Sequence, residues 1–249
     1  EAARAGADVA LSGGEPTLHP RLVELVRLAK REGARLVELQ TNATRLDDDA
    51  LVAALRDAGL DLAHVSLHAS SAARSDAITG APGTFERTAR GLDALSRAGV
   101  RVRLSFVFCR ENLGDFPAYV DVVAARWPGA EIAASFVAPS TDLVPRDAAL
   151  IPRYSEVVPH LAEGLRRARA RGVRVSGLDS MCGVPLCLVP DELAPYFALA
   201  EAPEGYDGGE IVDADACRAC ALRGRCFGLR RGYAELYGTS ELAPVSRDA

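Results

Sequence analysis

Two groups of residues in this sequence have types and spacing that could carry out chemistry. The first is a pentapeptide formed by Ser12, Gly13, Gly14, Glu15 and Pro16. Adjacent glycines let a ligand approach the backbone closely, and a neighbouring carboxylate can accept hydrogen bonds from an ammonium group. A turn of this composition is also a common plain connector between a strand and a helix. Its place in the fold therefore decides which interpretation is the better one.

The second group consists of cysteines, of which the chain has six. Three closely spaced thiolates can converge on one metal centre, with a fourth supplied from an earlier pair. In a cytoplasmic chain this clustering indicates metal ligands before disulfides. Spacing alone favours structural zinc, and Cys109, which stands apart, is expected to be a small core residue. The clustered cysteines are Cys182 and Cys187, followed by the C-x2-C-x5-C run of Cys217, Cys220 and Cys226.

Apolar runs of β-type composition alternate along the chain with helical patterns of 3.6-residue period. This repeated βα unit predicts a parallel sheet. Barrel enzymes place their active sites at the carboxyl ends of such strands, and the Ser12–Pro16 segment directly follows the first expected strand. The expected strands are 7–11, 35–41, 62–68, 100–108, 131–137 and 173–176, and the expected helices are 20–32, 47–58, 84–98, 113–126 and 154–171.

The periodicity fades after Ser176 into a segment rich in proline and cysteine. We therefore predict an α/β protein with two domains. The first, residues 1–176, is a truncated parallel (β/α) barrel of six strands or fewer. The second, residues 177–249, is a small loop-rich domain that carries the cysteine site. Residues 1–6 have the pattern of a helix end, so at least one strand, loop and helix is expected upstream.

The Gly-Gly-Glu motif of this chain resembles that of the radical S-adenosylmethionine (SAM) superfamily, where it holds the amino group of the SAM methionine. Four further segments resemble that family: ELQTNAT from 38 to 44, HVSLHAS from 64 to 70, ITGAPGTFERT from 78 to 88, and SFVFCRENLGD from 105 to 115. The resemblance implies that the bound cofactor is SAM. It also implies that Asn42 points towards the site, that Ser66 and His68 contact the ribose and carboxylate, and that Asn112 lies over the adenosine. His68 replaces the usual aspartate of that family.

The C-x2-C-x5-C run resembles the SPASM and twitch extensions of radical SAM enzymes, which favours an iron–sulfur cluster over zinc. Arg230 stands where the full SPASM pattern has another cysteine. Five cysteines suffice for one auxiliary [4Fe–4S] cluster, so one of the five is left over. The sequence does not say which one.

The CxxxCxxC loop that defines the family is absent, and no cysteine precedes Cys109. In the family those thiolates hold the [4Fe–4S] cluster that binds SAM. We therefore expect the segment to lie upstream and this chain to be inactive alone. The implied activity is reductive cleavage of SAM to a radical that abstracts hydrogen from a peptide or small-molecule substrate. The electron donor would be a protein such as flavodoxin or ferredoxin. The alternative is a non-catalytic, metal-stabilised binding module.

Composition narrows the partners further. A formal net charge of -5 provides no broad excess of positive charge that would attract nucleic acid or an anionic membrane surface. No long apolar run or signal sequence is evident, so we expect a cytoplasmic protein. Lys30 is the only lysine and lies in a helical pattern, which disfavours Schiff-base chemistry.

Overall fold

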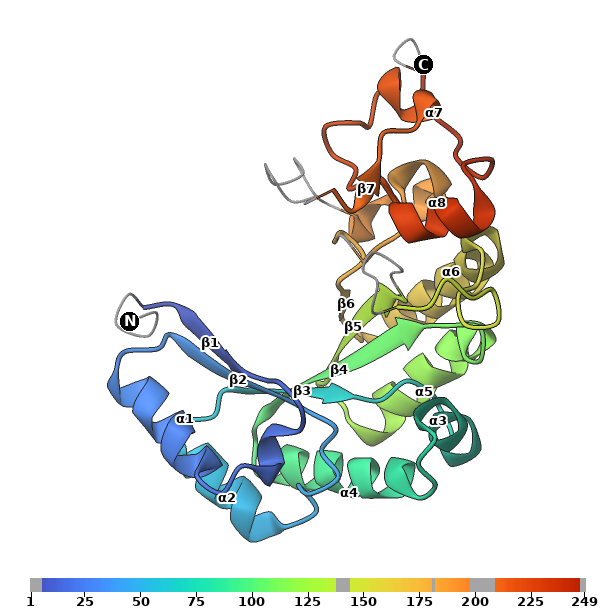
Figure 1. The fold of residues 1–249 in the computed structure, drawn as a ribbon. Coiled ribbons are helices and arrows are strands. Elements are labelled where there is room, and N and C mark those ends of the chain that lie inside the picture. Colours follow the sequence, from blue (N-terminus) through green and yellow to red (C-terminus); the bar gives the residue numbers. More distant parts are fainter. Residues whose placement is uncertain (1–5, 138–143, 181, 198–208, 247–249) are drawn as a thin grey trace. The chain divides into compact units, whose positions relative to one another are not determined.

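The computed structural model describes residues 6–137, 144–180, 182–197 and 209–246 (Figure 1). Within these residues, six strands form one sheet in the order of the chain, β1 to β6, and the pairings of β1 to β4 are parallel. This confirms the predicted α/β class with a partial barrel of parallel strands. The strands are β1 (Asp8–Leu11), β2 (Leu36–Thr41), β3 (Leu62–Ser66), β4 (Arg101–Phe108), β5 (Glu131–Phe136) and β6 (Val175–Ser176).

The predicted helices are present with small shifts at their ends. The first begins at Leu22, two residues after Pro20, and Arg21 is its N-cap. Sequence analysis missed helix α3 (Ala72–Thr79), because Ser75 is its only buried residue and an apolar stripe is therefore lacking. The other helices of this region are α1 (Leu22–Arg31), α2 (Asp49–Ala58), α4 (Thr84–Arg97), α5 (Phe116–Arg126) and α6 (Tyr154–Arg171).

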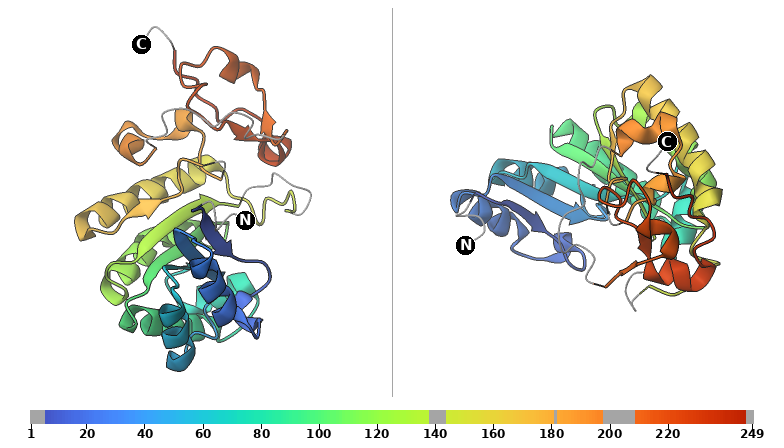
Figure 2. Two further views of the ribbon diagram at one scale, coloured as in Figure 1. Left: turned by 90° about the vertical axis from the view of Figure 1, so that its left-hand side faces the viewer. Right: turned by 90° about the horizontal axis from the view of Figure 1, so that it is seen from above.

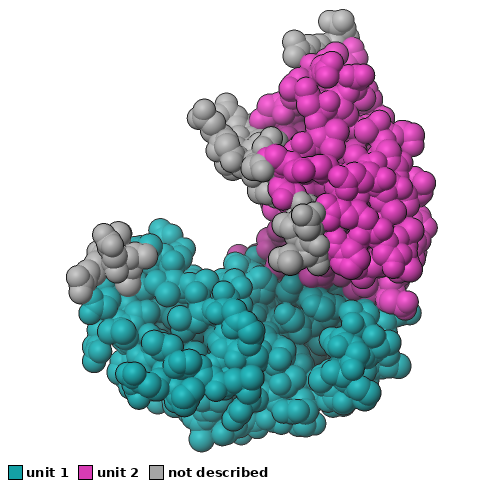
Figure 3. Space-filling view, viewed as in Figure 1, with its two compact units in different colours: residues 1–106, 121–132 teal, residues 107–120, 133–249 magenta. Residues whose placement is uncertain are grey.

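The chain divides into two compact units that differ from the predicted domains (Figure 3). The first unit comprises residues 1–106 and 121–132, and the second comprises 107–120 and 133–249. Strands β4 and β5 contribute residues to both units, so the division does not coincide with Ser176. The domain boundary near Ser176 stays a prediction from the sequence.

In the first unit, alternate residues of each strand point to opposite faces of the sheet. Val37, Leu39, Val65 and Leu104 are fully buried on one face. Helices α1, α2 and α4 lie on one side of strands β1 to β3 (Figures 1 and 2). Apolar burial against these helices holds the carboxyl ends of the strands in place, and the loops that carry the candidate site follow directly from those ends.

The second unit contains the carboxyl-terminal part of the chain. Strands β7 (Ile211–Val212) and β8 (Leu229–Arg230) pair antiparallel, and two short helices flank them, α7 (Asp215–Arg218) and α8 (Arg231–Tyr237). These elements are too short to give a periodic signal, so the sequence predicted only a loop-rich segment there.

A chain of aromatic rings forms part of the core of the second unit. The ring centroids of Phe108 and Phe136 are 4.9 Å apart, those of Phe136 and Tyr154 5.8 Å, and those of Tyr154 and Tyr233 4.3 Å. Such contacts contribute beyond simple area burial. They link the ends of β4 and β5 to helices α6 and α8.

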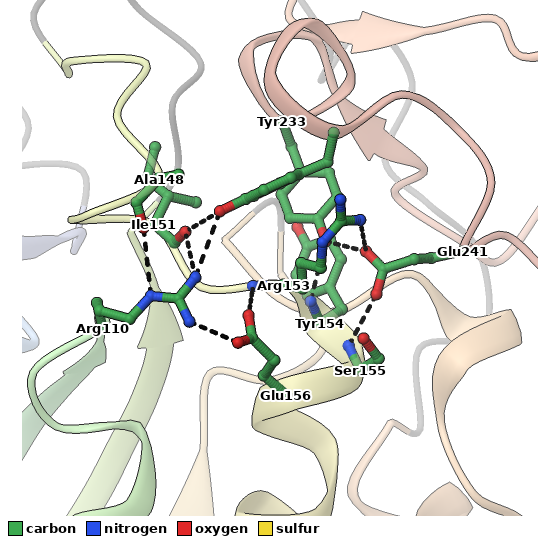
Figure 4. A network of polar contacts seen from close by, with 10 residues as sticks. Arg110, Ala148, Ile151, Arg153, Tyr154, Ser155, Glu156, Tyr233 and Glu241 are labelled. Atoms are coloured by element: carbon green, nitrogen blue, oxygen red, sulfur yellow. Dashed lines mark hydrogen bonds and ion pairs between the residues drawn. The ribbon is translucent and has the colours of Figure 1, made fainter.

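Hydrogen bonds and an ion pair also connect the end of β4, the start of α6 and helix α8 (Figure 4). Arg110 pairs with Glu156, with its Nη1 atom 2.5 Å from Oε1. The hydroxyl of Tyr237 donates to the carbonyl of Ile151, and the backbone N–H of Tyr154 donates to the hydroxyl of Tyr233. The start of α6 is thereby attached to α8. Among the described residues, no helix combines the length and the apolar composition that crossing a membrane requires.

Candidate functional site

The loop after β1 has the conformation that its glycines predict. Gly13 and Gly14 have φ angles of +93° and +50°, in the left-handed region that side chains rarely adopt. Both residues are exposed, and a Cβ at either position would meet only open space. The backbone requirement, rather than crowding, therefore explains the glycines, and it leaves the peptide groups of this loop open to a ligand.

Glu15 connects this loop to the end of β2. One oxygen of its carboxylate, Oε1, accepts hydrogen bonds from Thr17 N (3.0 Å), Thr17 Oγ1 (2.6 Å) and Thr41 Oγ1 (2.6 Å). The other oxygen, Oε2, accepts one from Asn42 N (2.8 Å). The sequence suggested only a ligand-binding role for Glu15. Its structural role depends on contacts with residues 26 and 27 positions away, which no local pattern indicates.

The surroundings of Glu15 shift its ionisation. Burial raises the pKa of the carboxyl group, but hydrogen bonds from Asn42, Thr17 and Thr41 outweigh this effect, so the pKa lies below the ordinary value of 4.5. The carboxylate is therefore charged at neutral pH. Because the pKa of Glu15 is lower in the folded than in the unfolded protein, the charged carboxylate stabilises the folded state. This stabilisation is fully present above the pKa of the unfolded state and is lost as the pH falls through the pKa of the folded state.

We expect Glu15→Gln to lower the free energy of unfolding at pH 7 by about 1–3 kcal/mol, because the amide replaces an acceptor of several hydrogen bonds. The difference from the unchanged protein should shrink below pH 4.5, where the native carboxylate also becomes protonated. Urea unfolding at several pH values measures both quantities. Glu24→Gln, at an exposed carboxylate, is the control. A difference that does not depend on pH would contradict the role of the charge.

The segment after β2 forms a tight turn. The side-chain oxygen of Asn42 accepts hydrogen bonds from Thr44 N (2.9 Å) and Thr44 Oγ1 (2.8 Å). Ala43 has a φ angle of +56°, the only left-handed conformation of a non-glycine residue in the described part of the chain. Helix α4 approaches closely, since a Cβ at Gly91 would lie 2.3 Å from the carbonyl oxygen of Ala43. The turn is thus held by its own side chains and by packing against α4.

The strained conformation of Ala43 leads to a test in which the same substitution has opposite effects at two positions. Ala43→Gly should raise the free energy of unfolding by about 1 kcal/mol, because glycine adopts the left-handed conformation without the Cβ penalty. Ala54→Gly, in the middle of α2, should lower it by about 1 kcal/mol. Chemical denaturation of both variants measures the two values. If Ala43→Gly is the more destabilising of the two, the packing of the Ala43 methyl group outweighs its strain.

The end of β3 carries Ser66 and His68. Ser66 is exposed and lies beside Ser105 in the register of the sheet, and His68 is half-buried two residues further on. Burial lowers the pKa of His68, although a hydrogen bond to the backbone of Ser105 partly opposes this. The ring is therefore neutral at pH 7 and can donate one hydrogen bond and accept another. Both residues lie at the carboxyl edge of the parallel sheet, as Glu15 and Asn42 do.

Asn112 belongs to the second unit and is fully buried. Its side-chain oxygen accepts from Cys109 N (2.8 Å), and its nitrogen donates to Val107 O (2.9 Å). These bonds shape the turn that follows β4. The position of Asn112 over an adenosine stays a prediction. Cys109 is 5% exposed and buried, as a small core residue would be.

Four of the five carboxyl-terminal cysteines line one cavity of about 180 Å³ in the second unit: Cys187, Cys217, Cys220 and Cys226. Two backbone N–H groups, of Leu186 and Gly228, donate to the sulfur of Cys226 at 3.3 Å. Burial raises the pKa of Cys187 and of Cys217, and the nearby thiols raise both further. Grouped thiols with N–H donors aimed at a sulfur are suited to binding a metal centre as thiolates.

Cys182 lies apart from this group. It does not line the cavity, and its sulfur is 3.6 Å from Nη2 of the buried Arg230. Its carbonyl accepts a hydrogen bond from Phe136 N (2.8 Å), which holds it at the end of β5. The structure therefore brings together four of the predicted ligands and places the fifth elsewhere.

The arrangement of the four thiols can be compared with the requirements of known metal centres. A single zinc ion requires sulfurs about 2.3 Å from the ion, and thus in contact with one another around it. In the described part of the chain, no three histidine, cysteine or acidic side chains are arranged to hold one metal ion. The four thiols that line the cavity are a donor set that both zinc and an iron–sulfur cluster use.

Comparison with known proteins bears on the first half of the chain. Residues 1–123 match the family model of the radical SAM superfamily. This part of the chain belongs to the radical SAM superfamily. The match covers the loops that carry Glu15, Asn42, Ser66 and Asn112, so the family assignment rests on the same segments as the site.

Two relatives and one solved structure illustrate the similarity. A probable GTP 3',8-cyclase of Saccharolobus islandicus is 45% identical over 105 residues, which are 42% of this chain and 33% of the relative. An Fe-coproporphyrin III synthase of Methanosarcina barkeri is 35% identical over 115 residues, 46% of this chain and 28% of the relative. The chain thus spans about a third or less of these relatives. Native anSMEcpe with bound AdoMet and Kp18Cys peptide has the same fold (TM-score 0.53, 15% identity), over 71% of this chain and 52% of that one.

Proposed function

We propose that this chain forms the larger part of a radical SAM enzyme with one auxiliary iron–sulfur cluster. The observation that carries the proposal is the position of Glu15, whose carboxylate joins the glycine loop after β1 to the Thr41–Asn42 segment after β2. A charged group is thereby fixed at the carboxyl edge of a parallel sheet, where such folds bind ligands. SAM bound at a reduced [4Fe–4S] cluster would supply a 5'-deoxyadenosyl radical that abstracts hydrogen from the substrate.

The residues of this chain would bind and orient SAM. The exposed peptide groups of Gly13 and Gly14 can hydrogen-bond the methionine part, and the remaining acceptor capacity of Glu15 Oε2 can receive its ammonium group. Ser66 and the neutral His68 can hydrogen-bond hydroxyl groups. The protein thus positions the cofactor, while the chemistry belongs to the cofactor itself.

The four cysteines around the cavity would hold the auxiliary [4Fe–4S] cluster, and Cys182 would be the one left over. This assignment of ligands is supported by the cavity that the four cysteines share, by the N–H hydrogen bonds to Cys226 and by the separate environment of Cys182 beside Arg230. The cluster would bind substrate or conduct electrons, in a domain of the twitch or SPASM type.

The substrate would be a peptide or a small metabolite. Two relatives are named for a GTP cyclase and a porphyrin-related synthase, and one protein of the same fold holds a peptide. We further propose a cytoplasmic protein that receives electrons from a flavodoxin or ferredoxin. The net charge of -5 favours neither nucleic acid nor membrane as a partner.

A non-catalytic, metal-stabilised module is the second candidate, because a metal centre held by the cysteines around the cavity would serve a structural role equally well. The coding sequence upstream separates the two: a CxxxCxxC segment supports the enzyme. The biochemical test uses the longer protein with this segment, reconstituted anaerobically and supplied with SAM and dithionite. Formation of 5'-deoxyadenosine is expected. If a fully reconstituted SAM cluster yields none, the catalytic proposal is wrong.

A further inference from the structure

The cavity lined by four cysteines in the second unit has little charge of its own to offset the negative charge of a thiolate-ligated cluster. Within its described lining, the charged residues are Asp213 and Arg223, and they pair with each other, with Arg223 Nη2 3.2 Å from Asp213 Oδ1. Cys220 is only 7% exposed, so water can offset little charge at its sulfur. How readily a cluster accepts an electron here therefore depends on hydrogen bonds to the sulfurs.

Backbone N–H groups contact the sulfurs of this cavity from three segments of the chain. The N–H groups of Leu186 and Gly228 both donate to Cys226 Sγ, each at 3.3 Å. Burial raises the pKa of Cys187, and a hydrogen bond from the backbone of Ala243 partly opposes this rise. Leu186 lies 40 positions from Cys226 in the sequence, so its bond results from the tertiary fold.

The two donors to this sulfur are held by the backbone around them. Leu186 begins a short 3-10 helix that ends at Leu188. Gly228 directly precedes β8 and has a φ angle of +82°, and a Cβ there would lie 2.7 Å from Cγ2 of Ile211. Donors that are fixed in advance need no reorientation when charge increases at the acceptor. Both N–H groups therefore stabilise a more negative sulfur, and with it a reduced cluster, more than an oxidised one.

We propose that the backbone N–H groups of Leu186 and Gly228 raise the reduction potential of the auxiliary cluster through the sulfur of Cys226. This inference rests on the proposed function and assigns two residues that tune the cluster without ligating it. The reduced cluster carries one more electron than the oxidised one, so its sulfurs are the stronger hydrogen-bond acceptors. The cluster consequently accepts an electron more readily than the same four thiolates would allow without these bonds.

Leu186→Pro tests the proposal, because it removes one of the two donors. Proline is tolerated at the first position of a helix, and Pro185, with a ψ angle of 131°, has the extended conformation that a residue before proline requires. In the anaerobically reconstituted chain, we expect the ratio of reduced to oxidised cluster at a fixed potential to fall about tenfold. For one electron this lowers the midpoint potential by about 59 mV. Redox titration, followed by visible absorption and electron paramagnetic resonance, measures the midpoint.

Two further versions of the chain isolate the N–H group. Leu186→Ala is the matched control, since it shortens the same side chain but keeps the donor, and its midpoint should equal that of the unchanged chain. If Leu186→Pro does not fold or load, replacement of Leu186 by its hydroxy acid, leucic acid, removes only the N–H and should lower the midpoint similarly. Gly228 offers no such proline variant, because its φ angle of +82° excludes proline.

The outcomes separate this inference from the proposed function. An unchanged midpoint in a fully loaded proline or leucic-acid version would overturn the inference and leave the auxiliary cluster in place. An equal decrease in Leu186→Ala would also overturn it, since the side chain rather than the N–H would then set the potential. If the unchanged chain takes up no iron and sulfide, the auxiliary cluster of the proposed function is wrong, and the inference with it.

Discussion

Replacing Cys217 or Cys220 with alanine is expected to abolish the iron–sulfur chromophore of the anaerobically reconstituted chain. Both residues line the cavity that they share with Cys187 and Cys226, and a [4Fe–4S] cluster ligated by cysteine uses four thiolates. The unchanged chain should take up about four iron and four sulfide, because the auxiliary site is the only grouped set of cysteines in the sequence. Iron and sulfide assays and the visible absorption spectrum measure this outcome.

Two matched variants make this result specific. Cys182→Ala should keep the chromophore, because Cys182 lies beside Arg230 and outside the cavity, and Cys109→Ala should keep it because Cys109 is buried after β4. A loss with Cys182→Ala equal to that with Cys220→Ala would show that the cluster has a different set of ligands. Stoichiometric zinc in protein purified without oxygen, with no uptake of iron, would instead favour a structural module.

Glu15→Gln is expected to weaken SAM binding by about 10- to 150-fold in a protein extended upstream by a CxxxCxxC segment. This factor corresponds to about 1.5–3 kcal/mol for one charge-assisted hydrogen bond. Equilibrium titration with SAM, after anaerobic reconstitution of each variant, measures the affinity.

The structural role of Glu15 requires a control for this second prediction. Since its carboxylate also holds Thr17, Thr41 and Asn42, the substitution could displace the loop without any direct contact to SAM. Thr41→Val removes one of these hydrogen bonds and keeps the charge. If Thr41→Val weakens SAM binding as much as Glu15→Gln does, Glu15 acts by positioning the loop. Unchanged affinity in Glu15→Gln would remove the assigned role altogether.

Much of the fold up to Ser176 could be predicted from the sequence. The strands from β1 to β6 alternate with helices at spacings that local patterns indicate, because side-chain periodicity and turn residues are properties of short segments. The glycine loop and the C-x2-C-x5-C run are local in the same sense. Helix α3 was missed because it lacks an apolar stripe, and the short elements after Ser176 were missed because they are too brief for a periodic signal.

Only the tertiary structure decided how distant residues combine. It showed that Glu15 holds the end of β2, that Cys182 is separate from the other four cysteines, and that the N–H of Leu186 donates to the sulfur of Cys226. Each of these facts depends on strand register or on chain reversal between residues far apart in sequence. A local pattern specifies which face a side chain points to, whereas its partner is set by the packing of whole elements against one another.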